Sequence, residues 1–142
     1  MKTITLIASL LFFGNSAFAA TKSITENKDV SHCAKVYGES DDECLGDLNE
    51  KSEKELNDSF NNKLKEITSH DYTRWWRGTQ EQKDRMLATY KQNQKEWIQY
   101  RNGYCELVST QAMGTHAFGE DMLGCILNMN KLRIEQINMI KP

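Results

Sequence analysis

The sequence is almost free of proline, since its one proline among 142 residues is Pro142, at the last position. A chain without internal proline can form long uninterrupted helices, because proline removes a backbone donor and breaks a helix interior. Apolar residues make up 39% and charged residues 27% of the chain, which excludes a low-complexity or collagen-like protein. The length fits one domain and is too short for two.

A strong charge of one sign is also lacking. Lysine and arginine number 18 and aspartate and glutamate number 20, so the formal net charge is only −2. A dedicated nucleic-acid-binding protein normally carries a basic face. We therefore expect no nucleic-acid partner.

Long apolar runs are missing except near the N-terminus. There, residues 4–13 follow Lys2 as an apolar stretch that is too short to span a bilayer of roughly 30 Å. Ala17 and Ala19 place small side chains at both positions that a signal peptidase reads. We predict a cleaved signal peptide over residues 1–19 and a mature chain without a membrane anchor, located in a bacterial periplasm or outside the cell.

Apolar residues recur at three- and four-residue steps in three segments, a pattern typical of amphipathic helices. The first segment starts near Cys44, the second opens at Thr79 with a Thr-x-x-Gln capping box, and the third follows Gly119. The stripes are Leu45, Leu48, Leu56, Phe60, Leu64 and Ile67; then Leu87, Tyr90, Gln94, Trp97, Ile98, Arg101, Cys105 and Val108; then Met122, Cys125, Met129, Leu132, Gln136, Ile137 and Ile140. Strand alternation is nowhere sustained. We predict an all-α fold, a small disulfide-stapled bundle of about three principal helices over residues 33–142, after a flexible leader at residues 20–32.

The four cysteines allow three disulfide pairings. An oxidising compartment favours disulfides, and pairing neighbours in sequence gives Cys33–Cys44 and Cys105–Cys125. The first bridge would tie the leader to the first long helix, and the second would staple the last two helices together. The alternative is a zinc site, for which His32 is a lone candidate ligand without a Cys-x-x-Cys motif or paired histidines. We expect disulfides and no metal.

Sequence motifs of catalysis are absent. The chain has no His-Glu-x-x-His pair, no Gly-x-Ser-x-Gly elbow and no glycine-rich phosphate loop. An oxidised Cys105 would have no thiolate to attack a substrate. We expect a protein that is not an enzyme and needs no cofactor. A hydrolase acting on cell-wall glycan is a weaker alternative, since acidic pairs such as Asp41-Asp42 are present.

Residues 94–101 read Gln-Lys-Glu-Trp-Ile-Gln-Tyr-Arg and are followed by Cys105. This segment resembles the signature of the LprI-like family of small secreted bacterial lysozyme inhibitors, in which Gln, Trp, Tyr-Arg and Cys recur at these spacings. Residues 52–60, which include Leu56-Asn57, look like the family's Ala-Asp-x-x-Leu-Asn-x-x-Tyr.

A third segment, Cys125-Ile126 followed by Arg133 and Ile137, is similar to the family's closing block. The resemblance spans residues 33–140 and includes all four cysteines. It implies a lysozyme inhibitor, with lysozyme or another peptidoglycan-cleaving enzyme as the partner.

Gln94 and Arg101 lie on the apolar stripe of the second helix, with Trp97 between them. A buried arginine must find a carboxylate or carbonyls, because an unpaired buried charge is costly. We predict Glu53, on the first long helix, as its partner, with Arg133 as a further member. We interpret this set as a structural network that holds helix register rather than a ligand site; Asn57 belongs to the same structural motif.

Two segments are candidates for partner binding. The first is the loop of residues 114–121, between Gly114 and Gly119, which carries His116, Phe118, Glu120 and Asp121. A loop held at its base by the predicted Cys105–Cys125 bridge loses little entropy on entering an enzyme cleft. The alternative is an ordinary helix connection.

The second candidate is the aromatic connector that contains Trp75 and Trp76. Both rings cannot face one core from a short loop, and tryptophan is enriched at binding hot spots. The alternative is that both rings cap the end of the bundle.

Together these features predict a secreted inhibitor that binds a lysozyme-like muramidase and blocks its active-site cleft. The acidic side chains within residues 39–47 would attract a basic partner, or would simply be a solvated face. The alternative function is a periplasmic immunity or regulatory protein that binds something other than lysozyme.

Overall fold

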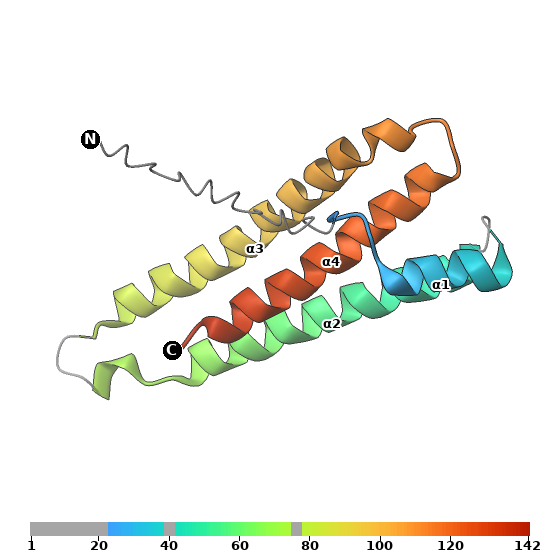
Figure 1. The fold of residues 1–142 in the computed structure, drawn as a ribbon. Helices are drawn as coiled ribbons and strands as arrows, with labels where there is room; N and C mark the ends of the chain where they lie inside the picture. Colours follow the sequence, from blue (N-terminus) through green and yellow to red (C-terminus); the bar gives the residue numbers. More distant parts are fainter. Residues whose placement is uncertain (1–22, 39–41, 75–77) are drawn as a thin grey trace, which may run out of the picture.

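The computed structural model describes residues 23–38, 42–74 and 78–142, and they form helices and no strand (Figure 1). The α-helices are α1 (Lys28–Tyr37), α2 (Asp42–Ser69), α3 (Gln80–Val108) and α4 (Ala117–Met139), with short 3₁₀ helices η1 (Tyr72–Arg74) and η2 (Thr110–Ala112). The all-α prediction is confirmed. The predicted signal peptide lies outside the described residues.

Three long helices make up the body of the bundle. The helices α2 and α4 run in the same direction and α3 runs in the opposite one, while α1 lies beside the start of α2 (Figure 1). The helix α4 packs most extensively against α2 and contacts α3 and α1 as well. These three helices are the predicted ones, and α1 is a shorter fourth helix before them.

Both predicted disulfides are present. Cys33–Cys44 joins α1 to α2 across a Cα–Cα distance of 5.8 Å, and Cys105–Cys125 joins α3 to α4 across 5.5 Å. Cys105 and Cys125 are both 0% exposed, so the second bridge is part of the core. Each bridge therefore fastens two helices at the same end of the bundle, where α1 meets α2 and α3 meets α4 (Figure 1).

The leader expected at residues 20–32 is described from residue 23 onward, and this part is held on the bundle rather than loose. The last part of this stretch is already helical in α1, and the rest lies on α4. Asn128 of α4 donates to the backbone carbonyl of Ile24 at 2.8 Å, and a Cβ added to Gly124 would lie 2.0 Å from the carbonyl oxygen of Thr25. Hydrogen bonds and a close backbone approach hold this segment, and neither leaves an apolar pattern in the sequence.

The start of α3 follows the prediction closely. Thr79 Oγ1 accepts from the Gln82 amide at 3.2 Å, and Gln82 Oε1 accepts from the Thr79 amide at 2.9 Å, so the capping box is complete. Farther along α3, the ring of Tyr90 stacks on Phe60 of α2 with the ring centroids 4.8 Å apart. The Tyr90 hydroxyl donates to the Phe60 carbonyl oxygen at 3.3 Å, which joins α3 to α2.

Burial raises the pKa of Tyr90 to about 12, whereas an unfolded tyrosine titrates near about 10. The folded chain therefore holds this proton more tightly. The resulting contribution to stability is complete below pH of about 10 and is lost as the pH rises through about 12. Tyr90→Phe is expected to remove the tyrosinate absorbance change near pH 12 and to lessen the loss of stability above pH 10.

The exposed Tyr100 supplies the matched control, because Tyr100→Phe removes a ring hydroxyl from the surface of the same helix. Ultraviolet titration of both variants decides the point. Identical high-pH curves for Tyr90→Phe and Tyr100→Phe would contradict the assignment.

Candidate functional site

Arg101 lies at the centre of a buried polar network that joins the three long helices. The residue is 5% exposed. Its Nη1 donates to Glu53 Oε1 on α2 and to Asn130 Oδ1 on α4, each at 2.5 Å. The ion pair with Glu53 is the predicted one. The guanidinium therefore fixes the register of α2, α3 and α4 relative to one another.

Asn130 is a member of this network that the sequence interpretation missed. It is fully buried, and its Nδ2 donates to Ser52 Oγ at 2.9 Å and to Glu53 Oε1 at 3.1 Å. With Arg101 donating to its Oδ1, both ends of the amide are used. A buried guanidinium needs several acceptors. The cost of burying the charge of Arg101, which predicted Glu53 as its partner, therefore also required a second acceptor, and Asn130 on α4 supplies it.

A second set of contacts surrounds Trp97. Arg133 of α4 donates through Nε to Gln94 Oε1 at 2.9 Å and through Nη2 to Asn93 Oδ1 at 2.6 Å. The guanidinium carbons of Arg101 and Arg133 lie 5.5 and 5.3 Å from the centroid of the Trp97 ring. Burial lowers the pKa of Arg133, but an arginine stays charged at this depth. The structural interpretation of these residues fits this geometry.

Gln94, a member of the contacts around Trp97, also lines a groove between α2 and α3, which we call the α2–α3 groove. Its volume is about 460 Å³. It is lined by Asn57, Phe60 and Leu64 from α2 and by Lys91, Gln94, Lys95, Ile98 and Gln99 from α3. The two motif residues Asn57 and Gln94 thus meet in one place, although Asn57 is exposed and stands apart from the Arg101 network.

The predicted loop of residues 114–121 is shorter in the structure. Gly114 turns the chain with φ of +83°, and α4 begins at Ala117, so Phe118, Glu120 and Asp121 belong to the first turns of a helix. Acidic side chains are favourable there because of the helix dipole. Gly119 continues the helix, so the connection outside helices is residues 113–116, and Phe118 is half-buried. Only His116 of the four candidate residues lies before the helix, and it is exposed.

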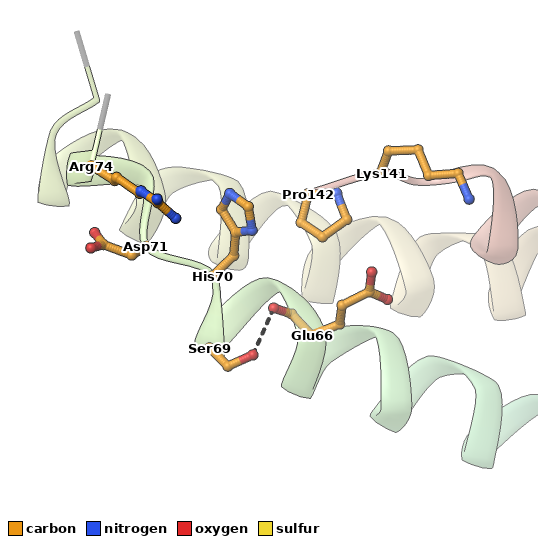
Figure 2. A pocket seen from close by; sticks show the side chains of 7 residues that line it. All are labelled: Glu66, Ser69, His70, Asp71, Arg74, Lys141 and Pro142. Carbon is orange, nitrogen blue, oxygen red and sulfur yellow. Dashed lines mark hydrogen bonds between the residues drawn. The ribbon is translucent and has the colours of Figure 1, made fainter. Parts of the chain in front are cut away.

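Trp75 and Trp76 lie outside the described residues. The neighbouring end of the bundle holds a pocket of about 570 Å³ lined by Glu66, Ser69, His70, Asp71, Arg74, Lys141 and Pro142 (Figure 2). The C-terminus is held against α2 there, because Lys63 Nζ on α2 donates to the Ile140 carbonyl oxygen at 2.9 Å. The same Nζ pairs with Glu66. The lining is polar and of mixed charge.

The described residues that flank the tryptophan connector lie at the opposite end of α3 from His116. The helix α3 separates them, and its 29 residues extend for about 43 Å at 1.5 Å per residue (Figure 1). The tryptophan connector precedes this helix and His116 follows it.

The described part of the chain offers neither a metal-binding cluster nor a free thiol. No cluster of three or more histidine, cysteine, aspartate or glutamate side chains there could hold a metal ion, and all four cysteines are in disulfides. Within the same residues, no helix combines the length and the apolar character needed to cross a membrane. The arrangement is a stapled body with polar and apolar depressions on its surface.

Residues 33–137 match the family model described as lysozyme inhibitor LprI. The chain belongs to the LprI family. The matched range begins at Cys33 and ends at Ile137, so it includes both disulfides and the whole Arg101 network. This LprI chain is therefore similar to a family of inhibitors rather than of enzymes. No curated protein and no solved structure matches the chain.

Proposed function

We propose that this LprI-family chain is a periplasmic or secreted protein that binds a lysozyme-like muramidase and blocks its active-site cleft. The observation that carries the proposal is the family match over residues 33–137. The two disulfides support an oxidising compartment, in which such bonds persist.

The contact surface that we propose is the end of the bundle where α2 and α4 begin, which we call the acidic end (Figure 1). It carries the exposed acids Asp42, Glu43 and Asp47 and the half-buried acids Glu120 and Asp121. This charge would attract a basic enzyme and accelerate association. Residues 39–41 precede this group and lie outside the described residues.

The connection of residues 113–116 stands between the two helices joined by Cys105–Cys125. Met113 is 63% exposed and His116 is exposed too. A short connection on a cross-linked base loses little freedom on binding. We propose His116 and Phe118, with Glu120 and Asp121, as contacts, and Trp75 and Trp76 remain predicted contacts that lie outside the described residues.

The proposal is tested by competition for the enzyme's cleft. A muramidase is loaded with a fluorescent N-acetylglucosamine oligomer and titrated with the oxidised mature chain, residues 20–142. Stoichiometric displacement of the oligomer is the expected result. Simultaneous binding of both would contradict the blocking of the cleft.

Removing charge from the acidic end is expected to weaken inhibition. The variant His116→Ala/Glu120→Gln/Asp121→Asn should raise the inhibition constant at least tenfold and reduce its dependence on salt. The control is Glu55→Gln/Glu135→Gln, which makes the same change of acidic charge at exposed positions farther along α2 and α4. Equal inhibition constants for the two variants, with circular dichroism unchanged, would count against this surface.

A further inference from the structure

Gln94, one of the residues that line the α2–α3 groove, carries an unused hydrogen-bond donor. Gln94 is 5% exposed, and its Oε1 accepts from Arg133 Nε. Because arginine can only donate, this bond fixes the orientation of the amide and leaves Nε2 as a donor. The buried Nε2 has no acceptor among the described residues.

An unsatisfied buried donor is unfavourable, so the presence of one beside Trp97 and Arg133 asks for a cause. The same residue's Oε1 is used, and Arg133, Asn93 and Trp97 hold its neighbourhood in place. The donor is thus fixed in a prepared position. A ligand oxygen that reached this atom from the groove, with a small shift of the side chains that cover it, would supply the missing acceptor.

The remaining groove residues define the ligand's chemistry. Phe60, Leu64 and Ile98 contribute apolar surface. Lys91 and Lys95 stand one helical turn apart, both exposed and with no ion pair in the described part of the chain, and no acidic residue lines the groove. A basic apolar depression on a chain of net negative charge selects for a carboxylate beside an apolar group.

We propose that the α2–α3 groove docks a segment of the partner muramidase that presents a carboxylate next to an apolar side chain. The apolar side chain packs against Phe60, Leu64 and Ile98. The carboxylate pairs with Lys91 and Lys95 and accepts from Gln94 Nε2. The identity of the partner rests on the function proposed above, whereas the chemistry of the groove does not.

One enzyme can reach both the groove and the acidic end. Lys95 and Val108 are separated by about 20 Å along α3 at 1.5 Å per residue. A partner domain of 100 residues has a radius of gyration of about 13 Å, so it is wide enough to touch both. The groove is then a second contact that adds affinity to the first.

The charge reversal Lys91→Glu/Lys95→Glu tests the docking. We expect it to raise the inhibition constant for the muramidase at least tenfold, with unchanged circular dichroism because both side chains are exposed. The matched control is Lys51→Glu/Lys131→Glu, which reverses two exposed lysines in a different groove between α2 and α4 and should change the constant less than threefold. Inhibition by the first variant equal to that of the unaltered chain would overturn the docking and leave the proposed function standing.

A peptide titration separates the groove from its proposed partner. Blocked acetyl-Glu-Phe-amide and acetyl-Lys-Phe-amide are added to the full mature chain, and the side-chain amide signals of Gln94 are followed by NMR, with the exposed Gln92 as reference. Saturable shifts of the Gln94 signals with the acidic peptide, but not with the lysine peptide, would support the groove chemistry. If no muramidase is inhibited at the same time, the proposed partner is wrong and the groove chemistry stands. Unmoved Gln94 signals with both peptides would overturn the proposal.

Discussion

Replacing Arg101 with alanine is expected to lower the free energy of unfolding by about 3–5 kcal/mol, the range for breaking a buried ion pair from one side. The side chain is almost fully buried, and its loss leaves Glu53 without its cation and the fully buried Asn130 without a donor to Oδ1. The Trp97 ring also loses one of its two guanidinium neighbours. Urea denaturation followed by circular dichroism measures the change.

Arg85→Ala is the matched control, because Arg85 lies on the same helix and pairs with Glu81 at the surface. An exposed pair of this kind is worth about 0–1 kcal/mol. A second variant, Arg101→Met with Glu53→Gln, removes both charges and should recover part of the loss, since no carboxylate is then left unpaired. If Arg101→Ala cost no more than Arg85→Ala, the network would not hold the bundle together.

Removing the Cys105–Cys125 bridge as Cys105→Ala/Cys125→Ala is expected to lower the free energy of unfolding by about 3 kcal/mol. The bridge closes a loop with a sequence separation of 20 residues, which the chain-entropy relation values at about this amount. The two alanines also leave space in a fully buried position, which adds to the cost. The midpoint of urea denaturation under oxidising conditions is the measurement.

Cys33→Ala/Cys44→Ala provides the comparison. That bridge has a sequence separation of 11 and fastens the short helix α1, and Cys44 is only half-buried. We expect a smaller loss of stability from it. A larger loss from the Cys33–Cys44 variant would show that the α1–α2 staple, rather than the α3–α4 one, carries the stability.

The sequence predicted α2 and α3 well because each presents one face to the rest of the bundle. On α3, the residues Tyr90, Gln94, Arg101 and Cys105 are all buried, as the stripe required. The stripe of α4 was less reliable: Leu132 is 50% exposed and Ile140 37% exposed, while Gly124 and Asn130 are buried. The helix α4 contacts α1, α2, α3 and the leader, so its buried positions do not follow one stripe.

The parts of the site that followed from a physical cost were predictable. A buried Arg101 required an acid, and Glu53 supplies it. The hydrogen bonds made by two asparagines of α4 could not be predicted in this way. Asn128 holds the leader and Asn130 completes the Arg101 network, yet a sequence pattern places both as surface residues. The loop predicted before α4 was too long. Gly119 indicated a loop in the sequence, whereas in the structure Gly119 lies within α4.

The most direct test of the account is the inhibition of peptidoglycan hydrolysis by the purified, oxidised mature chain. Several types of muramidase are assayed at low and moderate salt, with both disulfides verified by mass spectrometry. We predict saturable inhibition of at least one type at equimolar ratio, weaker at the higher salt concentration. Undiminished hydrolysis by every type, with the chain folded and both bridges intact, would contradict the proposal that this LprI-family protein inhibits a muramidase.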